Sequence, residues 1–167
     1  MTDRPPLSAD EILRRLVERG VDFVVIGGIA AVLHGSARNT FDLDICFAPD
    51  DVNLVALGDV LTALGARLKG VEEHAPFVPD ARTLGQIELL TLVTALGELD
   101  VLARPPGAPT YAELRRNADR HDLGGFNVSV ASIDDLIAMK QAAGRPKDLL
   151  DIEELDAIKR LRHRSVP

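Results

Sequence analysis

The stretch IGGIAAVLHGSARNTFDLDICF, residues 26–47, predicts both a local fold and a site. A glycine pair, Gly27–Gly28, follows a short apolar, β-branched run that is typical of a strand buried on both faces. Two aspartates, Asp42 and Asp44, then lie one residue apart on a second strand-like run. Alternation along that strand places both carboxylates on one face and Leu43 on the other, toward the core.

Together the two pairs predict a clamp for a metal ion and phosphate groups. Adjacent carboxylates repel each other, and a divalent cation removes that cost; oxygen ligands combined with substrate phosphates suit Mg²⁺. A helix that begins at the glycine pair offers unpaired backbone N–H groups to a phosphate. The spacing fits neither a dinucleotide-binding fingerprint nor a Walker loop, since no lysine occurs between Gly20 and Leu68. Taken alone, the aspartate pair is equally consistent with solvated carboxylates on an edge strand.

Composition narrows the class of protein. The 167 residues fit one domain, and the net charge of −7 argues against a protein that coats duplex DNA. The single cysteine, Cys46, excludes an intramolecular disulfide and a cysteine metal cage, and its apolar neighbours predict a core position. Residues 1–15 lack the apolar region of a signal peptide, and the longest apolar run, 23–33, is too short to span a bilayer. We therefore expect a cytoplasmic protein without a membrane partner.

Hydrophobic periodicity predicts the order of elements. Helices are expected over 9–19, 28–33, 51–64, 111–118, 132–143 and 147–162, and strands over 21–26, 41–47, 66–69, 86–93, 98–103 and 126–130. Ser8 and Glu11 predict a capping box, and Ser132 is expected to cap its helix. Val52 and Val55 are expected on the buried side of the third helix, and residues 71–84 to be irregular. The order predicts an α/β or α+β fold with one sheet.

The glycine pair and the aspartate pair together resemble the signature of a known protein family. Gly27–Gly28, followed after thirteen residues by Asp42-Leu43-Asp44, resembles the signature of the polymerase-β-like nucleotidyltransferase superfamily. The local sequence is most similar to that of minimal bacterial nucleotidyltransferases related to AbiEii-type toxins, in which HG-x-x-R-x-T precedes the aspartates. The matching residues are His34, Gly35, Arg38 and Thr40. MKQAAGRPKDLLDIEEL, residues 139–155, is similar to the K-x-A-A-G-R-P-K-D stretch of the same small enzymes.

The resemblance implies a fold and a set of site residues. We expect a mixed sheet flanked by helices, forming one nucleotidyltransferase domain over 1–167 with a core over about 8–130 and C-terminal helices over about 132–163. A third carboxylate is required on a neighbouring strand: Asp100 is expected, with Glu98 as the alternative and Glu88 as a distant one. The implied catalytic and metal-binding residues are Asp42, Asp44 and Asp100. The implied nucleotide-binding residues are Gly27, Gly28, Arg38, Thr40, Lys140, Arg145, Lys147 and Asp148, although Asp148 also fits a purely structural cap.

The function implied is transfer of a nucleoside monophosphate from a nucleoside triphosphate to an acceptor hydroxyl, with Mg²⁺ or Mn²⁺ as cofactor. The acceptor stays open among an RNA 3′ end, a protein side chain and a small molecule. The AbiEii resemblance suggests tRNA and a cognate antitoxin as partners. One alternative is a non-catalytic nucleotide-binding or protein-interaction module on the same fold. Another is an unrelated α/β protein, in which Asp42 and Asp100 would lie far apart.

The remaining histidines and the basic tail carry weaker expectations. His34 is expected to pack within the motif rather than to take part in catalysis. His74, His121 and His163 are isolated in the sequence and are expected at the surface or in loops. The basic run over 159–164 is expected to be a solvated helix end rather than an RNA contact.

Overall fold

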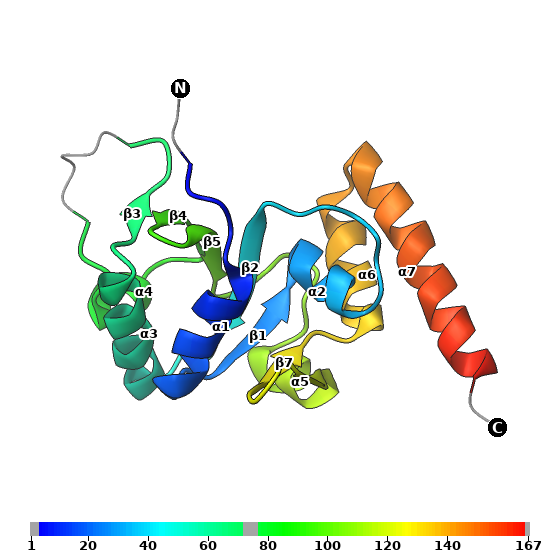
Figure 1. Ribbon diagram of the computed structural model, residues 1–167, viewed down its shortest axis with the longest axis horizontal. Coiled ribbons are helices and arrows are strands. Elements are labelled where there is room, and N and C mark those ends of the chain that lie inside the picture. The colour runs from blue at the N-terminus through cyan, green and yellow to red at the C-terminus, as the bar shows by residue number, and fades with distance from the viewer. Residues whose placement is uncertain (1–3, 72–76, 166–167) are drawn as a thin grey trace.

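A mixed seven-stranded sheet forms the centre of the protein (Figure 1). The computed structural model describes residues 4–71 and 77–165. The strands run in the order β3-β4-β5-β2-β1-β7-β6 across the sheet. Two pairs, β1 with β7 and β2 with β5, are parallel, and the other neighbours are antiparallel. The bounds are β1 (Phe23–Ile26), β2 (Asp42–Phe47), β3 (Arg67–Leu68), β4 (Leu89–Thr94), β5 (Gly97–Leu102), β6 (Asp119–Asp122) and β7 (Asn127–Val130).

The helices divide into two groups around this sheet (Figure 1). Helices α1 and α3 cover one face of the sheet, and α2, α6 and α7 gather beyond β1. The bounds are α1 (Ala9–Glu18), α2 (Gly27–Leu33), α3 (Asp51–Ala63), α4 (Ala81–Leu84), α5 (Tyr111–Asn117), α6 (Ile133–Ala143) and α7 (Pro146–Arg164). A mixed sheet flanked by helices, with a helical segment at the C-terminal end, confirms the fold prediction.

The centre of the sheet positions the predicted site. On β2, Leu43 and Ile45 are fully buried, whereas Asp42 and Asp44 on the opposite face are partly exposed. The parallel pairing of β2 with β5 places Asp44 directly opposite Asp100. Because directly paired residues project to the same face of a sheet, the register brings carboxylates from two strands together.

Local capping agrees with the sequence at one helix and not at another. The Ser132 hydroxyl accepts a hydrogen bond of 3.1 Å from the Asp135 N–H, as predicted. The capping box predicted for α1 is wrong, because the Ser8 side chain makes no capping hydrogen bond. Instead the Ser8 N–H donates to Leu96 O, and the Glu11 carboxylate accepts from Arg15 Nε. The N-terminal segment is thus held by the β4–β5 turn rather than by its own helix.

The buried side of α3 also differs from the prediction. Val52 and Val55 are exposed, by 82% and 50%, whereas Asn53 is buried. The Asn53 amide donates to Asp22 O and Ala48 O and accepts from the Asp22 N–H. This network turns the Asn53 side of the helix inward, so the prediction based on valine spacing was wrong.

Two short elements were not predicted. The polar strand β6 pairs with β7 at the sheet edge, and its sequence, DRHD, lacks the apolar alternation that marks a strand. Within the segment 71–84, expected to be irregular, the helix α4 is capped by Asp80, whose side chain accepts from the Thr83 N–H. Residues 72–76, including His74, lie outside the described residues.

The cysteine and histidine predictions have mixed outcomes. Cys46 is buried as predicted, and burial raises the pKa of its thiol to about 12. His34 has a packing role: it is buried with its Nε2 2.7 Å from Ala131 O, and burial lowers its pKa. His121, expected at the surface or in a loop, is partly buried in the strand β6, where its ring packs edge-to-face on that of His34 at 5.4 Å between centroids. His163 lies on the exposed end of α7.

Candidate metal and nucleotide site

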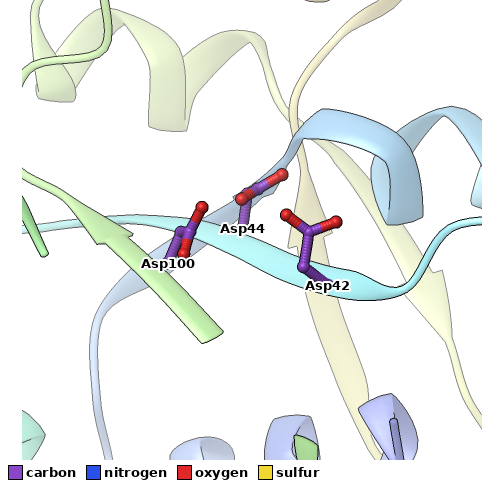
Figure 2. Close-up of side chains that lie close together, drawn as sticks. All are labelled: Asp42, Asp44 and Asp100. Atoms are coloured by element: carbon purple, nitrogen blue, oxygen red, sulfur yellow. The ribbon is translucent and has the colours of Figure 1, made fainter. Parts of the chain in front are cut away.

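Three carboxylates meet on one face of the sheet (Figure 2). One oxygen each from Asp42, Asp44 and Asp100 lies within 4.8 Å of the other two. All three side chains are partly buried, and over residues 4–71 and 77–165 they form the one such group of potential metal ligands. The prediction that the aspartates of β2 lie beside that of β5 therefore holds in space, and an arrangement with Asp42 and Asp100 far apart is ruled out.

The electrostatics of this group favour a cation. Burial, together with the negative charges of Asp42 and Asp100, raises the pKa of Asp44 to about 8. The pKa of Asp100 is also raised, mainly by burial, and its Oδ1 is buried without a hydrogen-bond partner. A divalent cation would supply the charge that these oxygens lack, and all-oxygen ligands suit Mg²⁺. The three aspartates thus fit the predicted metal.

Glu98, the alternative third carboxylate, has other partners. It is paired in register with Asp42 and is 8% exposed, but its carboxylate lies 2.8 Å from Lys69 Nζ. Arg4 Nη1 lies 3.0 Å from its other oxygen, an ion pair without hydrogen-bond geometry. Glu88 is exposed and lies outside the group of three aspartates. The register places Glu98 opposite Asp42 and Asp100 opposite Asp44, but only Asp100 joins the group of three carboxylates, because Glu98 is held by Lys69 and Arg4.

The glycine pair lies directly against this group. Gly27 has φ +67°, and a Cβ at this position would lie 2.1 Å from Asp44 Oδ2. A Cβ on Gly28 would lie 2.7 Å from Thr40 Oγ1. Only glycine can bring the start of α2 this close to the carboxylate. The two motifs of residues 26–47 are thus two sides of one site.

The loop between α2 and β2 is fastened to α7. Arg38 forms ion pairs with Asp151 and Glu154, and the Ala37 N–H donates to Glu154 Oε1. The Thr40 hydroxyl donates to Asp42 O at 3.2 Å. The roles of Arg38 and Thr40 in nucleotide binding stay predictions. In this structure the side chains of both residues hold the segment that leads into β2.

A second ion-pair cluster joins α6 and α7 beside the aspartates. Lys140 Nζ lies 2.9 Å from Asp151 Oδ2 and 3.7 Å from Asp148 Oδ1. Arg145 Nε donates to Asp148 Oδ2 at 2.8 Å. The charge of Lys140 counteracts the rise in the pKa of Asp44, and Asp44 in turn contributes to a raised pKa of Arg145. Lys140 and Arg145 therefore lie within electrostatic range of the aspartates, whereas Lys147 is exposed.

Two residues of the site were missed by the sequence reasoning. Asp151 connects Arg38 with Lys140, and its only sequence signal is its position one helical turn after Asp148. Lys69 forms an ion pair with Glu98, which lies on the same strand as Asp100. Nothing in the local sequence around Lys69 indicates this contact. Both depend on contacts between segments that are far apart along the chain.

Replacing Asp148 with alanine is expected to destabilise the protein by about 2 kcal/mol, because two cations lose a buried partner. The cost stays below that of a deep ion pair, since the Arg145 side chain that covers Asp148 is itself 56% exposed. Urea unfolding measures the change. Asp156→Ala, which breaks an exposed pair on the same helix, is the control and should cost less than about 0.5 kcal/mol. Equal losses in both variants would contradict the assignment.

A separate cavity lies away from the aspartates. It measures about 720 Å³ and is lined at the far end of β2 and β5 by Cys46, Phe47, Ala103 and Tyr111, among others. Asp42, Asp44 and Asp100 do not line it, although Glu88, the distant candidate for the third carboxylate, does. Its size therefore carries no argument about the chemistry at Asp42, Asp44 and Asp100.

The sheet, its flanking helices and the carboxylates on two neighbouring strands form a polymerase-β-like nucleotidyltransferase fold, which solved structures share. The chain belongs to the family described as nucleotidyl transferase AbiEii toxin, Type IV TA system, whose model matches residues 11–163. It is therefore a nucleotidyltransferase. No curated protein matches the chain in sequence.

Solved structures share this fold at low sequence identity. The lincosamide antibiotic adenylyltransferase LnuA, bound to lincomycin, is 17% identical with a TM-score of 0.62 over 92% of this chain and 99% of that one. ANT(2″)-Ia with adenylyl-2″-tobramycin is 18% identical, with a TM-score of 0.55 over 93% and 92%. TM1012 from Thermotoga maritima is 13% identical, with a TM-score of 0.50 over 98% and 99%. In the described part of this chain, no helix has the length and apolarity needed to cross a membrane.

Proposed function

We propose that the protein transfers a nucleoside monophosphate from a nucleoside triphosphate to an acceptor hydroxyl, with Mg²⁺ held by Asp42, Asp44 and Asp100. The observation that carries the proposal is the convergence of these three carboxylates within 4.8 Å of one another. Bound Mg²⁺ would neutralise charge on the phosphates and orient them for in-line displacement. Mn²⁺ has the same preference for oxygen ligands and is expected to substitute for it.

The chain's own residues take distinct parts in the reaction. The acceptor oxygen forms a bond to the α-phosphorus while the bond to the β-phosphate oxygen breaks and pyrophosphate leaves. We assign the hydroxyl proton to Asp100, through the carboxylate oxygen that is left free when the other oxygen holds Mg²⁺. Lys140 and Arg145 would hold the leaving phosphates against the backbone of Gly27–Gly28.

The supporting residues hold these groups in place. Asp148 orients Arg145 and Lys140, and Asp151 joins Lys140 to Arg38. Thr40 fixes the backbone of Asp42. Lys147 is exposed at the start of α7, where its side chain would contact the nucleotide at the solvent-facing side of the site. A constellation of this kind would be pre-organised before substrate binds, which is the main source of catalysis in phosphoryl transfer.

For the acceptor we propose an RNA 3′ end, with tRNA as the first candidate. The family description includes a toxin–antitoxin system, which supports a cognate antitoxin as partner and a cytoplasmic site of action. The lincosamide and aminoglycoside products named for two structural neighbours are small molecules, so the shared fold does not select the acceptor.

The test is incubation of the protein with each α-³²P-labelled nucleoside triphosphate, Mg²⁺ and total bacterial RNA, beside Asp44→Ala. Label on RNA that is absent with the variant supports both the reaction and the acceptor class. Pyrophosphate release without labelled RNA would keep the transferase and reject the RNA acceptor. Failure to bind any Mg²⁺–nucleotide complex would reject the proposal as a whole.

Added Mg²⁺ is expected to raise the melting temperature of the protein. This increase should become larger as the pH rises from 3.8, the ordinary pKa of an aspartate, to about 8, the raised pKa of Asp44. In this window the native state keeps a proton that the unfolded state has lost, so without metal the contribution of Asp44 to stability falls as pH rises. Mg²⁺ requires the ionised carboxylates and offsets that loss. At a concentration a hundredfold above Kd, the gain is about 2.7 kcal/mol.

Thermal denaturation with and without Mg²⁺, across this pH range, measures the effect. Asp44→Asn is the matched control, because its amide cannot ionise; its Mg²⁺ response should be small and nearly independent of pH. A Mg²⁺-induced shift in the wild type that stays constant over the range would contradict the link between Asp44 ionisation and metal binding.

A further inference from the structure

Two cations without an assigned role lie at the edge of the site beyond Asp100. Lys69 Nζ is 2.8 Å from Glu98 Oε2, and Arg4 Nη1 is 3.0 Å from Glu98 Oε1. The Glu98 side chain is only 10% exposed, while those of Lys69 and Arg4 are 34% and 57% exposed. One buried carboxylate thus holds two cations that remain open to solvent, which leaves a net positive charge beside the aspartates.

The sheet register places the side chain of Lys69 on the same face of the sheet as the aspartates. The Lys69 N–H donates to Thr91 O, Thr91 is paired with Asp100, and Asp100 is paired with Asp44. Two residues before Lys69, Arg67 is paired with Val93, and Val93 is in turn paired with Glu98. Directly paired residues project to one face, so this row of basic residues lies on the same side as the carboxylates.

Lys69 and the α6–α7 junction that carries Lys140 and Arg145 lie on opposite sides of the aspartates. In the sheet order, β4 and β3 follow β5 on the side away from β1, whereas Lys140 and Arg145 belong to the helices gathered beyond β1 (Figure 1). In an in-line displacement the attacking oxygen approaches opposite the leaving pyrophosphate. If pyrophosphate leaves toward Lys140 and Arg145, as in the proposed function on which this inference rests, the acceptor enters over β5. Lys69 and Arg4 are therefore on the acceptor side.

We propose that Lys69 and Arg4 bind a phosphate of the acceptor next to its reacting hydroxyl, and so select an acceptor that carries a phosphodiester or phosphomonoester. The protein as a whole has a net charge of −7, so attraction of an anion has to come from a local group of cations. Lysine and arginine are the residues that hold phosphates. A polycationic aminoglycoside, such as the tobramycin product bound by ANT(2″)-Ia, would be repelled at this edge.

The first test measures binding of a fluorescent single-stranded RNA with a free 3′ hydroxyl. Lys69→Gln is expected to weaken binding about tenfold, and Arg4→Gln, which removes a more exposed cation, about threefold. Each variant should reduce the slope of log affinity against log salt by about one. Lys159→Gln removes a cation on α7 and is the control; it should bind as the wild type does. Mg²⁺–nucleotide binding should stay unchanged in Arg4→Gln and Lys159→Gln.

Glu98→Gln separates a binding role from a structural one. It breaks the ion pairs of Glu98 with both Lys69 and Arg4 but keeps both cations, so RNA binding should be at least as tight as in the wild type. Loss of binding in Glu98→Gln equal to that in Lys69→Gln would assign the pairs to structure alone and overturn the proposal. Because Arg4 is largely exposed, Arg4→Gln is expected to fold and keeps the test valid if Lys69→Gln does not.

The second test compares transfer to a nucleoside and to the same nucleoside 5′-monophosphate. The wild type is expected to prefer the phosphorylated acceptor, and Lys69→Gln and Arg4→Gln to reduce that preference through a higher KM for the phosphorylated acceptor. Transfer without this preference, or RNA binding by Lys69→Gln and Arg4→Gln equal to the wild type, would overturn the inference and leave the proposed function intact. Absence of both nucleotide binding and pyrophosphate release would instead reject the proposed function.

Discussion

Replacing Asp44 with asparagine is expected to lower the rate of nucleotidyl transfer by at least about a thousandfold, or about 4 kcal/mol of transition-state stabilisation. Asp44 lies at the centre of the site: it contacts the glycine turn on one side and is paired with Asp100 on the other. An amide of the same shape keeps the packing but removes one charged metal ligand. Pyrophosphate release at saturating Mg²⁺ and nucleotide measures the loss.

The same substitution is expected to stabilise the metal-free protein near pH 8. The raised pKa of Asp44 means that ionising this carboxyl costs free energy in the folded state, and asparagine does not incur that cost. Asp10→Asn, at an exposed position of α1, is the control and should change neither activity nor stability. A variant that keeps its pyrophosphate release, or that melts below the wild type without metal at this pH, would contradict the assignment of Asp44.

Replacing Gly27 with alanine is expected to cost about 3 kcal/mol of stability and to abolish transfer. Two effects add: an alanine at φ +67° is strained, and its Cβ would lie 2.1 Å from Asp44 Oδ2. The backbone of α2 cannot move freely, because it continues directly from the buried strand β1. The Asp44 carboxylate must therefore rotate away from the position in which it faces Asp42 and Asp100. Urea unfolding and nucleotidyl transfer measure the two losses.

Gly65→Ala separates backbone strain from the clash. Gly65 has nearly the same φ, +62°, but a Cβ there would meet nothing within 4 Å. This control should lose about 1 kcal/mol of stability from strain alone and keep full activity. If Gly27→Ala behaves like Gly65→Ala in both measurements, the close approach between the glycine turn and Asp44 is not needed for function.

Local sequence determined a large part of this site. Alternation along residues 41–47 is sufficient to place Asp42 and Asp44 on one face, because side-chain direction in a strand depends only on its own backbone. The glycine pair likewise marks a sharp entry into a helix, and Gly144 with Pro146 marks the junction of α6 and α7. These signals come from neighbours in the chain, so the sequence alone contains them.

Local reasoning failed where side chains have partners far along the chain. Val52 and Val55 have apolar side chains at helical spacing, but the hydrogen bonds of Asn53 to Asp22 and Ala48 set the orientation of α3. The polar strand β6 is stabilised by its pairing with β7 rather than by an apolar pattern of its own. In both cases a contact from elsewhere in the fold outweighs local pattern.

The sequence by itself determined that two aspartates share a face and that a glycine turn precedes them, and the family resemblance implied a third carboxylate among Asp100, Glu98 and Glu88. The tertiary structure favours Asp100, because it lies in one group with Asp42 and Asp44 while Glu98 is held by Lys69 and Arg4. Register between strands that are more than fifty residues apart depends on how the whole sheet packs. Local periodicity fixes which face a side chain takes, and only the pairing of distant strands fixes what it meets there.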